Sequence, residues 1–132
     1  MKAMTIKEHG GPDQLVLAEL PVPAPAQGEV LIRVKALGIN RAETYMRKGA
    51  WGKVARVSGI ECVGLVEQDT TGRFPKGGTV AAIMGGMGRT RNGSYAEYTC
   101  VPATNVFALD TDLDWAELAA IPESYATAWS CL

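Results

Sequence analysis

The stretch that decides the fold is "EVLIRVKALGINRAETYMRKG", residues 29–49. Its first part alternates apolar and polar side chains with the period of a β-strand, and residues 41–48 change to helical spacing. At the corner between the two elements the chain gathers polar side chains, namely Asn40, Arg41, Glu43, Thr44, Tyr45 and Arg47. These residues could form a solvated helix face or one wall of a site, and the helical spacing alone favours neither.

The rest of the chain continues the strand pattern, with short alternating runs separated by turns. The segment "PVPAPAQG", residues 21–28, cannot be a central strand, because proline lacks the N–H that a ladder needs. Apart from residues 41–48, Asp114–Ile121 is predicted to be helical, with Asp112 or Asp114 as its N-cap, and the segment at the end of the chain also looks helical. Strands are predicted at Lys2–Ile6, Leu15–Glu19, Val30–Leu37, Cys62–Glu67, Thr79–Ile83 and Ser94–Val101. This order predicts a mainly β fold, a barrel or partly open barrel with a few short helices at its margins.

Composition indicates one ordinary globular domain. The chain has 132 residues, of which 47% are hydrophobic and 20% charged, and its net charge is −1. This balance gives no basic surface for nucleic acid or for an anionic membrane, and no apolar run approaches the roughly 20 residues of a membrane span. The N-terminus places Lys7, Glu8 and His9 where a signal peptide needs an apolar core. We therefore expect a cytoplasmic protein without nucleic-acid or membrane partners.

The cysteines and the single histidine offer no metal motif. Three cysteines without a C-x-x-C pair are too few for a four-cysteine zinc site, and they are expected to be free and mostly buried thiols. The only histidine, His9, lies in a turn and is expected at the surface. The cysteines are Cys62, Cys100 and Cys131.

Two further features admit a functional and a structural interpretation. The glycine-rich segment "GGMGRTRNG", residues 85–93, could cradle a phosphate, but a strand pattern follows it instead of a helix, so a mobile surface loop is the better prediction. Glu61 lies inside an apolar stretch and could be a general acid or base, or a hydrogen-bonded buried carboxylate that anchors a loop.

Several segments, in the same order along nearly the whole chain, resemble one known family. They are "GGPDQLVL" (10–17), "PVPAPAQGEVLIRVKALGINRAETYMRKG" (21–49), "SGIECVGLV" (58–66) and "GSYAEYTCVPATNVFALDTDLDWAELAAIPESYATAWSCL" (93–132). The chain resembles the medium-chain dehydrogenase/reductase superfamily, and within it the quinone oxidoreductase branch, the zinc-free relatives of alcohol dehydrogenase. The resemblance implies a GroES-like, partly open β-barrel, in agreement with the strand pattern.

The resemblance also implies a domain organisation. In the family such a barrel is the N-terminal portion of the catalytic domain, and a dinucleotide-binding Rossmann domain follows it. Residues 1–132 would thus be a fragment of a longer protein, inactive alone. The cofactor, NADPH or NADH, would be bound mainly by the missing domain, which also carries the residues that discriminate between the two.

The resemblance implies that zinc is absent. Zinc-dependent relatives carry a Cys in the segment matching "GIN" and a His before the Glu in the segment matching "GIE". Here Asn40 and Ile60 occupy these positions. An isoleucine cannot ligate zinc and an amide is a poor ligand, and the lobe of four cysteines that binds structural zinc is absent too. Without zinc, the task of Glu61 would be structural.

The resemblance assigns roles to the polar corner. Asn40 and Tyr45 match the residues that face the nicotinamide end of the cofactor and the substrate, which makes them the candidate catalytic and cofactor-binding residues. Thr127 matches a threonine that approaches the nicotinamide. Arg41 and Thr44 would face the substrate pocket, although Arg41 departs from the apolar residue or proline that is frequent there.

These matches imply a zinc-independent oxidoreductase in the full-length protein. It would transfer a hydride from the nicotinamide cofactor to a small-molecule quinone or conjugated enone, with Asn40 and Tyr45 positioning a carboxamide or carbonyl and with water or Tyr45 as proton donor. The full-length protein is expected to be a homodimer. The alternative is a non-catalytic binding or assembly module that uses the same GroES-like barrel.

Overall fold

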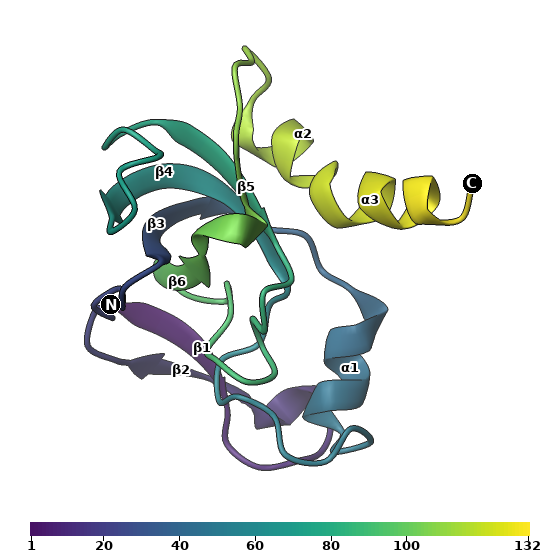
Figure 1. The fold of residues 1–132 in the computed structure, drawn as a ribbon. Helices are drawn as coiled ribbons and strands as arrows, with labels where there is room; N and C mark the ends of the chain where they lie inside the picture. The colour runs from purple at the N-terminus through teal and green to yellow at the C-terminus, as the bar shows by residue number, and fades with distance from the viewer.

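The computed structural model describes all of residues 1–132 and contains two antiparallel sheets beside three short helices (Figure 1). Five strands form the larger sheet in the order β6-β3-β4-β5-β7, and β1 and β2 form a separate ribbon. Both sheets are open, which confirms the predicted mainly β class and the partly open architecture. The elements are β1 (Lys2–Ile6), β2 (Leu15–Glu19), β3 (Glu29–Ala36), α1 (Arg41–Arg47), β4 (Glu61–Asp69), β5 (Thr79–Ile83), β6 (Tyr98–Pro102), β7 (Val106–Ala108), α2 (Trp115–Ala119) and α3 (Pro122–Ser130).

The core lies on the inner face of the larger sheet. Alternation in β3 buries Val30 and Ile32 completely, while Arg33 and Lys35 point to solvent. Burial of apolar surface of this kind is the dominant stabilising term of a small β domain. The cluster comprises Val30, Ile32, Cys62, Val66, Phe74, Val80, Ala82, Met87, Val101, Ala103 and Val106.

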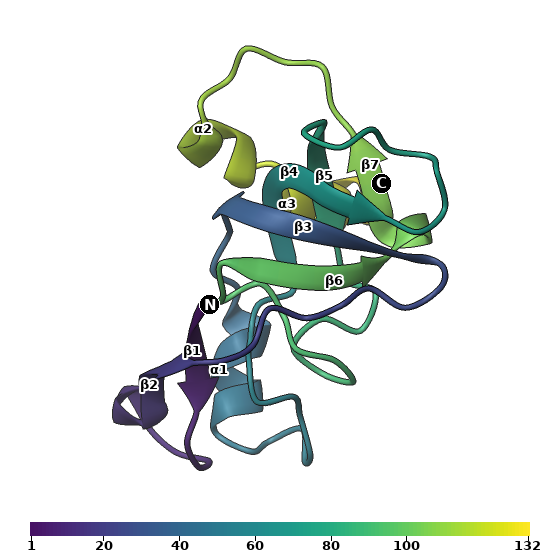
Figure 2. The ribbon, with the colours of Figure 1, turned by 90° about the vertical axis from the view of Figure 1, so that its left-hand side faces the viewer.

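The larger sheet is strongly curved (Figure 2). The register between β3 and β4 shifts twice, between Leu31 and Ile32 and between Val34 and Ala36, and such irregularities bend a sheet and increase its twist. Gly64 permits the close approach of the two strands, since a Cβ there would lie 2.1 Å from the Arg33 carbonyl oxygen. The curvature turns the end of β3 toward α1 and the start of α3.

Three predicted strands, Lys2–Ile6, Leu15–Glu19 and Thr79–Ile83, are confirmed residue for residue. The strand predicted at Ser94–Val101 begins later, at Tyr98, because residues 94–97 pair irregularly with β1. There the Met4 N–H donates to the Tyr95 carbonyl at 2.8 Å, and Ala3 and Ala96 form an isolated bridge. The strand β7 was not predicted.

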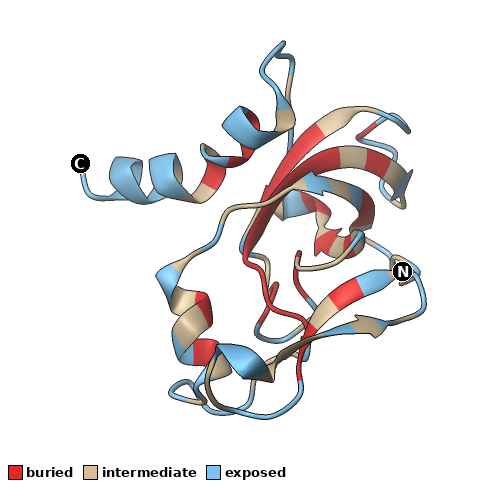
Figure 3. Cartoon of the chain, turned by 180° about the vertical axis from the view of Figure 1, so that it is seen from behind, coloured by how far each residue is buried: buried red, intermediate tan, exposed pale blue.

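The predicted helix Asp114–Ile121 was wrong in its extent. The structure has two helices, α2 with Asp114 as N-cap and α3 beginning at Pro122. Proline is compatible with the first turn of a helix but not with its interior, so the chain ends one helix and starts another. Most of α3 is exposed beyond Pro122 (Figure 3). None of the helices has the length and apolar character that crossing a bilayer requires.

The glycine-rich segment 85–93 is not simply a surface loop, as the sequence predicted. Met87 is almost fully buried and belongs to the core cluster, and Gly93 is buried beside the Val57–Gly59 backbone. A Cβ at Gly93 would lie 2.1 Å from the Gly59 carbonyl oxygen, so this glycine is required for the close contact. The segment is therefore anchored at both ends, and only Arg89, Thr90 and Asn92 are exposed.

Candidate functional site

The corner between β3 and α1 is held by the buried carboxylate of Glu43. Its Oε2 accepts a hydrogen bond from the Asn40 backbone N–H at 2.8 Å, and its Oε1 accepts one from the Ile60 N–H at 3.1 Å. The first of these is one half of a capping box at the start of α1. The second hydrogen bond joins α1 to Ile60, the residue directly before β4. The Glu43 carboxylate thus joins the backbone of Asn40 to the backbone of Ile60 and fixes the position of Asn40.

Glu61 connects the same corner to α3. Its Oε1 accepts a hydrogen bond from Asn40 Nδ2 at 2.8 Å, and its Oε2 accepts one from the Glu123 N–H at 2.8 Å. The second bond satisfies one of the free N–H groups at the start of α3 and places a negative charge at the positive end of that helix. Gly38 is needed here, because a Cβ at this position would lie 2.0 Å from Glu61 Oε1. The structural interpretation of Glu61, a hydrogen-bonded buried carboxylate, agrees with these contacts.

The network extends to the predicted cofactor residue on α3. Thr127 Oγ1 donates to Glu123 Oε1 at 3.2 Å, one turn earlier on α3, while the backbone N–H of Glu123 donates to Glu61, which binds Asn40. Thr127 is exposed. The structure therefore connects Asn40 and Thr127 indirectly, through the Glu61 carboxylate and the first turn of α3.

Glu43 is a functional candidate that the sequence analysis did not single out. Burial raises its pKa, and the hydrogen bond from the Tyr95 hydroxyl, at 2.5 Å from Glu43 Oε2, opposes this. Burial and the adjacent Glu43 in turn raise the pKa of Tyr95. The one available signal was Asn40 three residues before Glu43, the spacing of a capping box. It predicts a helix cap but not the burial.

Arg41 and Tyr45 lie together on the solvent side of α1. Arg41 Nε donates to the Tyr45 hydroxyl at 3.1 Å, and its guanidinium lies 5.7 Å from the centre of the Tyr45 ring. Tyr45 is 38% exposed. The Thr44 hydroxyl donates to the Arg41 carbonyl oxygen at 2.7 Å and is therefore already engaged by the helix backbone.

Two hollows flank α1, and only the smaller one is lined by residues that the sequence predicted for the site. The smaller, of about 160 Å³, is lined by Asn40 and Thr44. The larger, of about 490 Å³, is here called the α1 hollow. Its lining includes neither these two residues nor Arg41, Tyr45 or Thr127. It is lined by Ala42, Met46, Trp51, Lys53, Ile60, Met84, Gly86, Met87, Arg89, Thr90 and Glu123.

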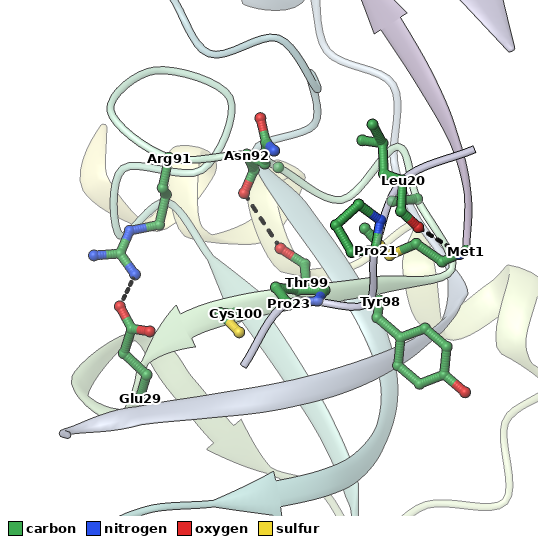
Figure 4. A pocket seen from close by; sticks show the side chains of 12 residues that line it. Met1, Leu20, Pro21, Pro23, Glu29, Arg91, Asn92, Tyr98, Thr99 and Cys100 are labelled. Atoms are coloured by element: carbon green, nitrogen blue, oxygen red, sulfur yellow. Dashed lines mark hydrogen bonds and ion pairs between the residues drawn. The ribbon is translucent and has the colours of Figure 1, made fainter. Parts of the chain in front are cut away.

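A third hollow, of about 440 Å³, lies between the proline-rich connector and β6 (Figure 4). Pro21 and Pro23 line one wall and Cys100 lies on the other, while Arg91 forms an ion pair with Glu29 at one end. Burial raises the pKa of the Cys100 thiol to about 11, which leaves it protonated and a poor nucleophile. This hollow contains none of the predicted site residues.

The residues at the two zinc-ligand positions do not fit a zinc ion. Ile60 is 4% exposed and forms part of the wall of the α1 hollow, and the Asn40 amide donates to Glu61. The adjacent Cys62 is buried in the core, where burial raises its pKa to about 12. No three His, Cys, Asp or Glu side chains gather as a metal-binding group. The free thiols differ more than predicted, since Cys62 is buried and Cys131 is exposed.

Comparison with known proteins identifies related chains. Residues 26–111 match the model of the alcohol dehydrogenase GroES-like domain. The chain is 35% identical to the quinone oxidoreductase of Homo sapiens, and the match covers 100% of this chain and 40% of that protein. It therefore spans about two fifths of the length of such relatives.

Solved structures give the same relationship. The human synaptic vesicle membrane protein VAT-1 homolog-like protein superposes with a TM-score of 0.88 at 31% identity, covering 100% of this chain and 42% of that one. The quinone oxidoreductase from Thermus thermophilus, whose structures include a complex with NADPH, superposes with a TM-score of 0.78 at 36% identity, with coverage of 100% and 40%.

Proposed function

Because this chain belongs to the alcohol dehydrogenase GroES-like domain family of the medium-chain dehydrogenase/reductase superfamily, we propose that it forms the N-terminal part of the catalytic domain of a quinone oxidoreductase. The full-length protein would reduce a quinone or a conjugated enone with NADPH or NADH, without zinc. Two electrons pass as a hydride and a proton follows, so that a quinone becomes a hydroquinone while the nicotinamide is oxidised. A following Rossmann domain would hold most of the cofactor.

The observation that carries this proposal is the bridging position of Glu61. Its carboxylate fixes Asn40 at the start of α1 and the first turn of α3, and it thereby fixes two elements whose residues line the α1 hollow. Preorganised polar groups of this kind lower a barrier because they need no rearrangement when charge develops. A volume of about 490 Å³ lies within the range of small-molecule pockets and accommodates a planar ring.

The chain's own residues would serve the nicotinamide end of the cofactor. The bound nicotinamide supplies the hydride. Asn40 and Tyr45, which lie at α1 but outside the α1 hollow, would orient its carboxamide or the part of the acceptor that carries the carbonyl oxygen, and Thr127 would contact the nicotinamide from α3. Met46 and Ile60 would exclude water from the ring face. The proton would come from water or from the Tyr45 hydroxyl, and Arg41, bound to that hydroxyl, would influence its release.

The two ligand positions support the proposal that the protein works without zinc. Zinc in this family would need side chains that ligate, and the buried Ile60 and the amide of Asn40 provide none. We further propose that the full-length protein is a cytoplasmic homodimer.

The test is steady-state kinetics of the full-length protein with 1,4-naphthoquinone and each nicotinamide cofactor. Loss of one positioning hydrogen bond in a water-excluded site lowers kcat by about 10²–10³, and we expect this range for kcat/KM in Asn40→Ala and Tyr45→Phe. Tyr98→Phe is the matched control, because Tyr98 lines the hollow beside β6 instead. Wild-type kcat/KM in both variants would remove them from the site. Absence of any turnover in the full-length protein would favour the non-catalytic module.

A further inference from the structure

The α1 hollow carries two cationic side chains that have no anionic partner in the chain. Lys53 and Arg89 both line it, and neither side chain makes an ion pair or a hydrogen bond within the protein. Its one acidic side chain, Glu123, accepts the Thr127 hydroxyl hydrogen bond. The lining thus has two positive charges against one negative charge, although the chain as a whole has a net charge of −1.

Arg89 is held in a defined place at this hollow. Its guanidinium lies over the Trp51 indole, 5.0 Å from the ring centre, and both residues are exposed loop residues that line the hollow. The N–H donors of a guanidinium that lies over an aromatic ring point outward in the guanidinium plane, where they remain free to bind a carboxylate, sulfonate or phosphate. The stacking orders the side chain before any ligand arrives and so lowers the entropy cost of binding an anion.

The opposite side of the hollow is apolar and locally strained. Met46, Ile60 and Met87 are each at most 4% exposed and form a floor of adaptable, mostly thioether surface. Met84, also in the lining, is the one non-glycine residue with a positive φ, at 60°, and its N–H donates to the Ile60 carbonyl at 2.7 Å. Such strained backbone persists where surrounding structure imposes it and concentrates at functional sites.

We propose that the α1 hollow selects planar conjugated acceptors that bear an anionic group. The ring would lie on the methionine-rich floor, and the anion would lie between Arg89, stacked on Trp51, and Lys53. This inference rests on the proposed quinone oxidoreductase function and adds the charge of the acceptor to it. On this proposal, Arg89 and Lys53 determine the specificity for the acceptor, and they are separate from Asn40 at the start of α1.

The experiment uses the full-length protein and a pair of acceptors with one ring system, 1,4-naphthoquinone and 1,4-naphthoquinone-2-sulfonate. The measured quantity is the ratio of kcat/KM for the sulfonate to kcat/KM for the neutral quinone, at saturating cofactor. Taking the variant's ratio relative to that of the wild type cancels the different intrinsic reactivity of the two acceptors. We expect Arg89→Gln to lower the ratio about tenfold, or about 1.4 kcal/mol, and Lys53→Gln to lower it several-fold.

Controls separate this effect from general electrostatics. Lys76→Gln removes one exposed positive charge in the turn between β4 and β5 and should leave the ratio unchanged. Raising the salt concentration should lower the ratio in the wild type and have less effect in Arg89→Gln, since salt screens exposed charges.

Four results would overturn the inference. An unchanged ratio in Arg89→Gln would show that the cation does not contact the acceptor. A raised KM for NADPH without one for NADH, again with an unchanged ratio, would assign the cations to the cofactor phosphate. Failure of the wild type to reduce either acceptor would refute the proposed function, and this inference with it, whereas reduction of both with equal salt dependence would refute the inference alone.

Discussion

Replacing Glu61 with glutamine should detach α3 from the sheet. The carboxylate accepts two hydrogen bonds, from Asn40 Nδ2 and from the Glu123 N–H, both at 2.8 Å. A glutamine offers one acceptor oxygen and turns its NH₂ group toward the other donor. The loss is one hydrogen bond to a charged group, about 1.5–3 kcal/mol, plus the negative charge at the start of α3, about 0.3–1 kcal/mol. The expected destabilisation is therefore about 2–4 kcal/mol.

Two measurements check this prediction. Urea unfolding gives the change in stability, and amide hydrogen exchange of α3 (Pro122–Ser130) reports whether the helix has become locally labile. The matched control is Glu67→Gln on the same strand, where the lost partner is Lys76 at 2.9 Å and both side chains are well exposed. An exposed pair contributes about 0.2–1 kcal/mol, so the control should change little. Equal effects in the two variants, or unchanged exchange in α3, would refute the bridging role of Glu61.

Three further predictions concern the same region. Burial raises the pKa of Glu43 above its ordinary value of 4.5. Between the ordinary and the raised pKa, Glu43 binds more protons in the folded chain than in the unfolded chain. The contribution of Glu43 therefore makes the free energy of unfolding fall as the pH rises through this range. Glu43→Gln should remove this pH dependence from the urea midpoints measured between about pH 4 and 7. A variant whose midpoints change with pH as steeply as those of the wild type would contradict the prediction. Gly38→Ala would place a methyl group 2.0 Å from Glu61 Oε1 and should lower stability by about 1–3 kcal/mol, whereas a midpoint within the error of wild type would contradict it. Metal analysis of untagged, chelator-free protein should find no stoichiometric zinc, because Asn40 and Ile60 replace the ligands; one dialysis-resistant zinc per chain would contradict it.

The sequence predicted the architecture well where alternation is long enough to read. In β3 the alternation agrees with the burial of Val30 and Ile32 and the exposure of Arg33 and Lys35, although Leu31 is buried as well. Strand β7 (Val106–Ala108) is three residues long, too short for any periodicity, and it exists because β5 offers it a free edge. The break between α2 and α3 was signalled by Pro122, and the predicted helix ends at Ile121, two residues beyond the observed end of α2.

The candidate site was predictable only in part, since spacing along the chain does not reveal which hollow a side chain enters. Asn40 was recognised, and its bond to Glu61 joins residues 21 positions apart. The α1 hollow was missed, because its walls come from four separate segments and include Met87, from a loop expected at the surface. Trp51 and Arg89 meet only through folding, so neither carried a signal by itself.

The proline-rich connector along β6 has a consequence for how the protein avoids self-association. β6 is an edge strand of the larger sheet. The unpaired backbone of an edge strand can pair with a strand of another chain, which leads to aggregation. Pro21 and Pro23 lie across that margin and form a wall of the hollow there (Figure 4). Because the two prolines have no N–H to donate, they cover the edge of β6 without forming a further hydrogen-bonded strand. In the folded protein the connector thus limits the addition of a further strand at this edge of the sheet.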